Sequence, residues 1–160
     1  MQKYKVSYML LFFGFYSFSV QASNSVSLNY AYGKERGAES MHGYNVLIKH
    51  DLNDFGLMLS GTYIDNTKEK QNVYIKNKYA SFMPGVAYNF TNDTSIYGLA
   101  GISCGSNVQA KQNNEIYGAA FGSGVLINVS HNVQLNIGYE LGLVSGKEIN
   151  IFTTGVGYVF

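Results

Sequence analysis

Three histidines, His42, His50 and His131, are the side chains best suited to acid–base chemistry in this sequence. Histidine titrates near neutral pH and serves as a general base for hydroxyl nucleophiles. Ser40 and Glu39 stand close to His42, but nearness in sequence does not bring a nucleophile, a base and an orienting acid into hydrogen-bond reach. The strand pattern described below places the histidines at opposite ends of the fold. We therefore predict that the protein is not an enzyme.

A metal or cofactor site has similarly little support. One cysteine and scattered histidines do not supply a ligand set, so no metal and no cofactor is expected. We interpret Cys104 as a small lipid-facing residue. The alternative for an odd cysteine in an exported protein is intermolecular pairing.

Basic side chains form the second chemically suggestive group, because they attract phosphate, sulfate and carboxylate groups. Eight basic and six acidic residues fall in the segments expected at one rim, which gives that rim a net charge of +2. We hypothesise that they contact lipopolysaccharide phosphates or acidic host glycans; the alternative is that exposed loops are charged because water surrounds them. The candidate binding residues are Lys34, Arg36, Lys68, Lys70, Lys76, Lys78, Lys111 and Lys147.

The N-terminus predicts export. Lys3 and Lys5 precede an uncharged stretch at 6–20, and Val20-Gln21-Ala22 offers a small-residue cleavage site. This layout is that of a secretory signal peptide, so we expect residues 1–22 to be removed and residues 23–160 to form one domain. A retained membrane anchor is the alternative, although the apolar stretch is short for a spanning helix.

The composition favours a β protein. The chain has 14 tyrosines, 10 phenylalanines and 18 glycines, with one proline and no tryptophan. Its formal net charge is +1, and nothing in this balance suggests a nucleic-acid partner.

Alternation with period two dominates the mature sequence. From Val133 to Leu143, every second residue is large and apolar, and the residues between them are polar or glycine. In a soluble sandwich the apolar face would meet a core, whereas in a membrane barrel it faces lipid and the polar face points inward. The pattern predicts strands at 24–33, 42–51, 55–65, 78–90, 95–106, 116–127, 133–143 and 149–160. An even count of strands this long predicts an all-β, eight-stranded antiparallel up-and-down transmembrane β-barrel.

The connecting segments alternate in character. Segments 51–54, 91–94 and 128–132 are short, whereas 34–41, 66–75, 107–114 and 144–148 are mostly longer and more charged. Short periplasmic turns and longer outer loops are typical of these barrels, so both termini are expected in the periplasm.

The inward face predicts a packed lumen. Glycines such as Gly118, Gly122 and Gly124 leave room for larger side chains from opposite strands, so we expect no open pore. Lys49 and Glu140 also have inward parity. Because a buried charge must be paired or hydrogen-bonded, we expect both in one polar network, with Tyr79 as a further candidate member.

Five stretches resemble the Ail/Lom/OmpX family of small outer-membrane barrels. They are Met41-His-Gly-Tyr-Asn-Val-Leu-Ile-Lys49, Pro84-Gly-Val-Ala-Tyr88, Ser95-Ile-Tyr-Gly98, the segment 132–140 and Gly155-Val-Gly-Tyr-Val-Phe160. The likeness spans essentially all of 23–160. It departs in the loops, which are shorter than in adhesive members, and at Leu47 and Leu126, which take inward positions where relatives tend to be polar.

The resemblance implies a bacterial outer-membrane protein whose surface loops mediate adhesion, host interaction or serum resistance. Its candidate partners are membrane lipid, lipopolysaccharide and host matrix or complement proteins, and we expect a monomer. The alternative is a structural component of the membrane without a dedicated ligand. The resemblance also implies that Tyr158 and Phe160, which share the outward face of the last strand, act as a signal for the outer-membrane insertion machinery.

Overall fold

Eight β-strands make up the described part of the chain. The computed structural model describes residues 24–35, 40–70, 73–109, 112–144 and 146–160, and their side chains except at 67–70, 73–76, 107–109 and 112–115. The strands are β1 (Asn24–Glu35), β2 (Ser40–Leu52), β3 (Phe55–Lys70), β4 (Val73–Asn89), β5 (Thr94–Gln109), β6 (Gln112–Asn128), β7 (Val133–Val144) and β8 (Lys147–Val159). Within these residues, no helix is long and apolar enough to cross a membrane.

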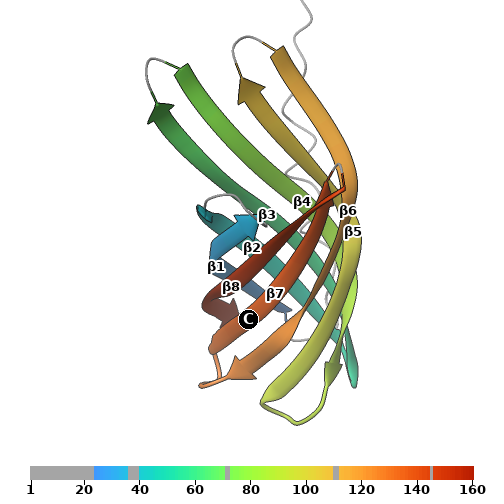
Figure 1. The fold of residues 1–160 in the computed structure, drawn as a ribbon. Helices are drawn as coiled ribbons and strands as arrows, with labels where there is room; N and C mark the ends of the chain where they lie inside the picture. The colour runs from blue at the N-terminus through green and yellow to red at the C-terminus, as the bar shows by residue number, and fades with distance from the viewer. Residues whose placement is uncertain (1–23, 36–39, 71–72, 110–111, 145) are drawn as a thin grey trace, which may run out of the picture.

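The strands form a closed antiparallel barrel in sequence order (Figure 1). Each strand pairs with its neighbours along the chain, and β1 pairs with β8 from Ser25↔Val159 to Glu35↔Ile149. Closure matters because an open sheet edge in lipid would leave backbone N–H and C=O groups without partners. The expected eight-stranded up-and-down architecture is confirmed.

The two faces of the wall follow the predicted alternation. Large apolar side chains such as Leu28, Val86 and Ile137 are exposed on the outside, whereas polar residues such as Asn29 and Asn136 are buried inside. Exposure of this kind is what a lipid-facing surface requires, since hydrocarbon takes the place of a protein core. The expected outward positions of all eight strands lie on the exposed side.

The two ends of the barrel differ more than the sequence suggested. β3, β4, β5 and β6 have 16 or 17 residues, whereas β1, β2, β7 and β8 have 12 or 13. As a result, the β3–β4 and β5–β6 hairpins project beyond the rest of the rim (Figure 1). Pairing of Lys76 with Val108 continues the sheet across β4 and β5 into this projection.

This projection corrects the prediction of long outer loops at 66–75 and 107–114. Most of these residues continue the strands: Asn66↔Asn77 and Lys70↔Val73 pair in one hairpin, and Asn107↔Asn114 in the other. Above the membrane, both faces of a strand meet water, so polar residues replace the apolar alternation. The period-two signal therefore ends before the hydrogen-bonded ladder does.

The lumen is filled by side chains in layers. Tyr79 packs against β7 at Gly142, where an added Cβ would come 2.5 Å from its hydroxyl oxygen. Tyr97 lies against Gly124 in the same manner, so glycine does accommodate large residues from other strands, as expected. Two buried apolar clusters occupy the lumen: one contains Leu47 and Met83, and the other contains Tyr79 and Ile151.

Candidate functional site

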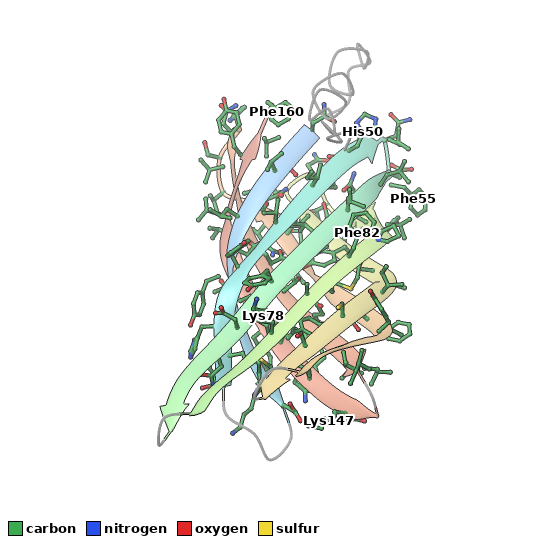
Figure 2. All side chains as sticks on the ribbon, turned by 90° about the horizontal axis from the view of Figure 1, so that it is seen from above. His50, Phe55, Lys78, Phe82, Lys147 and Phe160 are labelled. Carbon is green, nitrogen blue, oxygen red and sulfur yellow. The ribbon has the colours of Figure 1, made fainter. Side chains whose placement is uncertain are left out.

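The outer rim carries three described basic residues of the predicted binding set. Lys34 and Lys78 are exposed near the outer ends of β1 and β4. Lys147 is 62% exposed, and its ammonium group lies 2.7 Å from a carboxylate oxygen of Glu35. Figure 2 places Lys147 at the end of the barrel opposite His50, Phe55 and Phe160. A pair with one exposed partner adds little stability, but it partly neutralises the charge of Lys147.

For the other five predicted binding residues, the structure describes either the backbone alone or nothing. Arg36 and Lys111 lie outside the described residues. Lys68, Lys70 and Lys76 belong to the projecting β3–β4 hairpin, where their backbones pair with Ile75, Val73 and Thr67, while their side chains lie outside the description.

Glu140 is the centre of a hydrogen-bonded cluster inside the barrel. Its side chain is 3% exposed. Tyr79 and Ser81 donate to one carboxyl oxygen, at 2.7 and 2.6 Å, and Thr62 donates to the other at 2.6 Å. Among the described side chains, no lysine, arginine or histidine is bonded to Glu140, so hydroxyl groups alone solvate it.

Asparagine side chains extend this cluster across the barrel. Asn45 donates to Thr62 at 2.9 Å and to Ser60 at 2.7 Å, and Asn29 donates to Asn45 at 2.7 Å. The chain of bonds therefore links β1, β2, β3, β4 and β7. Buried polar groups satisfied in this way fix the relative positions of the strands that carry them.

Lys49 forms a separate cluster at the periplasmic end of the lumen. Its ammonium group is 2.8 Å from Asp51, 2.8 Å from the side-chain oxygen of Asn89 and 2.9 Å from Ser95. Asn89 also donates to Asp51 at 3.0 Å. All three donors of the lysine are used, as a lysine that is 4% exposed requires.

The expectation that Lys49 and Glu140 share one network is wrong for the described hydrogen bonds, although Tyr79 does join Glu140 as predicted. The inward residues of β2 show the reason. Leu47 lies between Asn45, which belongs to the Glu140 cluster, and Lys49, and it is part of an apolar layer. On β4, Met83 of the same layer separates Ser81 from Asn89.

Thr62, Ser81, Asn89 and Ser95 were not singled out from the sequence. All four have inward parity on predicted strands, and that signal was available. Parity gives the face of a residue but not its height in the barrel. Height depends on strand tilt and register, so the sequence alone did not group these residues.

A polar cavity of about 750 Å³ opens at the periplasmic end. Lys49 and Ser95 lie at its base, and Asp54, Asp93 and His131 line its rim. The short turns between β2 and β3, β4 and β5, and β6 and β7 surround it. Asn53 takes a left-handed conformation, with φ of 66°, in the first of these turns, which asparagine tolerates better than most residues.

The three histidines are placed apart. His42 lies on β2 next to Tyr30 and Tyr32. The hydroxyl group of Tyr30 is hydrogen-bonded to Nδ1 of His42. The ring centroids of Tyr32 and His42 are 5.2 Å apart. His50 lies at the other end of β2, and His131 is exposed in the β6–β7 turn. Cys104 is half-buried on the outward side of β5.

The two ends of the described chain meet at the barrel seam. The backbone N–H of Asn24 donates to the carbonyl of Phe160, and the N–H of Phe160 donates to the carbonyl of Asn24, both at 2.9 Å. The rings of Tyr158 and Phe160 stack, with centroids 6.3 Å apart, on the outward face. Their action as an insertion signal stays a prediction.

Three known proteins show what the chain is similar to. It is 28% identical over 152 residues to outer membrane protein X of Enterobacter cloacae, which covers 89% of this chain and 88% of the relative. It is 26% identical over 161 residues to the virulence membrane protein PagC of Salmonella typhimurium, covering 86% and 87%. The crystal structure of Ail, the attachment invasion locus protein of Yersinia pestis, in complex with the heparin analogue sucrose octasulfate, has a TM-score of 0.76 at 23% identity. It covers 87% of this chain and 97% of Ail, and at this identity it shows the shared fold. No family model matches the chain.

A closed eight-stranded barrel with an apolar outer surface and a filled polar-and-apolar lumen is an outer-membrane β-barrel protein. Its sequence relatives, outer membrane protein X and PagC, match it along nearly its full length and support the resemblance to the Ail/Lom/OmpX family of these proteins. Its location is accordingly the bacterial outer membrane, with the β3–β4 and β5–β6 hairpins at the cell surface.

Proposed function

We propose that this protein attaches the bacterium to host surfaces by binding anionic polysaccharides, sulfated glycans above all, through the lysines of its outer rim. The observation that carries the proposal is the projection of the β3–β4 and β5–β6 hairpins. The β3–β4 hairpin carries the lysine-bearing segments 68–70 and 73–76 beyond the rest of the rim, and Lys78 is exposed on the same hairpin. Sulfate and phosphate groups are attracted to such a basic surface over about a Debye length.

The relatives support this proposal by what they bind or are named for. Ail was crystallised with a heparin analogue, which carries dense sulfate groups. PagC is named a virulence membrane protein. We also propose host matrix proteins, complement proteins and lipopolysaccharide as further candidate partners of the same basic rim.

We also propose a binding role without catalysis, by a monomeric barrel. The separate placement of His42, His50 and His131 supports the absence of a catalytic group assembled from them. Insertion into the membrane would use the outer-membrane insertion machinery, with Tyr158 and Phe160 as its signal.

The test is binding of the barrel, held in phospholipid nanodiscs, to immobilised heparin at increasing salt. Replacing Lys68, Lys70, Lys76 and Lys78 with glutamine should weaken binding and flatten its salt dependence, because fewer charges remain to attract the glycan. Lys147→Gln is the matched control: it removes one lysine that already has a carboxylate partner, so its effect should be smaller. Desulfated heparin should bind weakly to the parent protein.

If the protein is instead a structural component of the membrane without a dedicated ligand, we expect no specific binding to heparin. If the parent protein does not bind heparin, or binds it equally after the four substitutions and at all salt concentrations, the anionic-glycan proposal fails. Loss of the protein would then be expected to change the envelope rather than attachment to host cells, which a deletion strain would reveal.

A further inference from the structure

The lipid-facing surface has an apolar hollow across β4, β5, β6 and β7. Its volume is about 590 Å³, and Pro84, Val86, Phe121 and Leu141 stand around it. Pro84 lies five residues from the end of β4 at Asn89, and Ala100 six residues from the start of β5 at Thr94. A tilted strand crosses the bilayer in about 9–11 residues, so the hollow lies near the middle of the hydrocarbon.

Small residues create the hollow. Gly98, Ala100 and Ser123 occupy neighbouring outward positions on β5 and β6, where most of the barrel carries large apolar side chains. A Cβ added at Gly98 would meet no atom within 4 Å, which shows that the space above it is open. Val86 and Phe121 flank this space as exposed walls.

The strand under the hollow carries an apolar residue on its inner face. Leu99 points inward, is 7% exposed and belongs to the apolar layer that contains Met83 and Leu47, yet it also lines the hollow. Inside the barrel the Leu99 side chain packs over two glycines: a Cβ at Gly85 would come 2.6 Å from it, and one at Gly122 would come 3.2 Å from it. The wall here is therefore one backbone layer with apolar surface on both sides.

The backbone ladder is interrupted at the same place. The pairing of β4 with β5 runs from Lys76↔Val108 to Phe82↔Ile102 and resumes at Gly85↔Leu99. Pro84 lies in the gap, and proline has no N–H to donate to a neighbouring strand. The hollow thus coincides with the one break in the strand pairing of the described β4–β5 ladder.

We propose that this hollow is a binding site for one hydrocarbon chain of a membrane lipid. Water is excluded at this depth, and an empty apolar space would forfeit the dispersion contacts of the groups around it. A flexible chain from the surrounding bilayer supplies those contacts, whereas large apolar side chains such as Leu28 and Ile137 cover other parts of the outer face. The site does not depend on the proposed glycan binding, which involves the outer rim.

The chain has no tryptophan, so a single introduced tryptophan can report on the hollow. Phe121→Trp places the reporter in its wall, and Ile137→Trp places a control on the exposed outer face of β7, outside the lining. Both proteins would be refolded into phosphatidylcholine vesicles whose acyl chains carry bromine near the middle. The reporter at 121 should be quenched about twofold more strongly, because a seated chain adds a second contact to the one that any lipid-facing ring has.

A matched pair of glycines makes the test specific. Gly98→Leu should fill the hollow and reduce quenching at position 121 to that at position 137. Gly61→Leu should leave it unchanged, because Gly61 is also open on the outer face but lies on β3, outside the hollow. Equal quenching at both reporters, or a reporter at 121 that does not respond to Gly98→Leu, would overturn the proposal.

A second measurement guards against a reporter that fails to fold. Spin-labelled phosphatidylcholine around the tryptophan-free protein should show a motionally restricted population that Gly98→Leu reduces and Gly61→Leu does not. If Gly98→Leu does not fold, Ala100→Leu fills the same space from the neighbouring outward position. A restricted population equal in all folded variants would also overturn the site.

Discussion

Lys49 at the periplasmic mouth is neutralised by the carboxylate of Asp51, whereas Glu140 deeper in the lumen is held by hydroxyl groups of Thr62, Tyr79 and Ser81. In the Lys49–Asp51 pair the hydrogen-bonding roles are fixed, since an ammonium group only donates and a carboxylate only accepts. Around Glu140 the roles can change, because a hydroxyl group can rotate and either donate or accept a hydrogen bond. The same lumen therefore holds one charge that depends on an oppositely charged partner and one acidic group that depends on hydroxyl groups whose hydrogen atoms can reorient.

The largest effect is expected from Lys49→Met. It leaves Asp51 without its cation and removes the shared donor to Asn89 and Ser95. Breaking a buried pair costs several kcal/mol, and since Asp51 is 22% exposed we expect a loss of about 2–3 kcal/mol. Urea unfolding of the barrel in lipid vesicles measures it. Lys78→Met, at an exposed position, should change stability little, and equal losses in the two variants would contradict the difference.

Tyr79→Phe should have an intermediate effect. It keeps the ring packed against Gly142 but removes one donor to Glu140, which costs about 1–2 kcal/mol at a buried acidic group. Tyr158→Phe provides the control, because Tyr158 is exposed on the outer surface. If both substitutions had the same effect in unfolding, the hydroxyl shell would not be holding Glu140.

Glu140→Gln should cost less, below about 1 kcal/mol. The amide keeps the shape and one acceptor oxygen, and the surrounding hydroxyl groups can rotate to accept from its N–H₂ group. The same unfolding measurement applies. A loss as large as that of Lys49→Met would mean that the hydroxyl shell is as rigid as the ion pair.

The smallest effect is the coupling between the two clusters. The layer that contains Leu47 and Met83 separates them, so the losses from Lys49→Met and Glu140→Gln should add to within about 0.5 kcal/mol in the double variant. A double-mutant cycle measures this directly. An interaction energy clearly above that range would show that a path of polar contacts crosses the apolar layer.

Alternation of side chains along the sequence was enough to predict the eight strands and the outward face of each. It succeeds because every outward position within the membrane contacts lipid and is therefore expected to be apolar. It failed at 66–70, 73–75, 107–109 and 112–114, where polar residues interrupt the alternation in the sequence while the strands continue. It also failed to separate Lys49 from Glu140, although the inward leucine at position 47 was recognised as unusual. The role of Leu47 as a divider depends on the height of Met83 on another strand, and only the register provides that height.

The backbone hydrogen bonds between Asn24 and Phe160 close the barrel, so the first and last strands are paired in the same way as any other two neighbours. If the predicted cleavage leaves a chain that begins at residue 23, a short linker between these ends would close it, and new ends could be opened in the β2–β3 or β6–β7 turn at the same side of the barrel. Such a circular permutant would preserve every strand pairing while moving the terminal aromatic residue to an internal position. It would separate two properties that coincide in the natural order: the geometry that closes the barrel, and the identity of the strand that is made last.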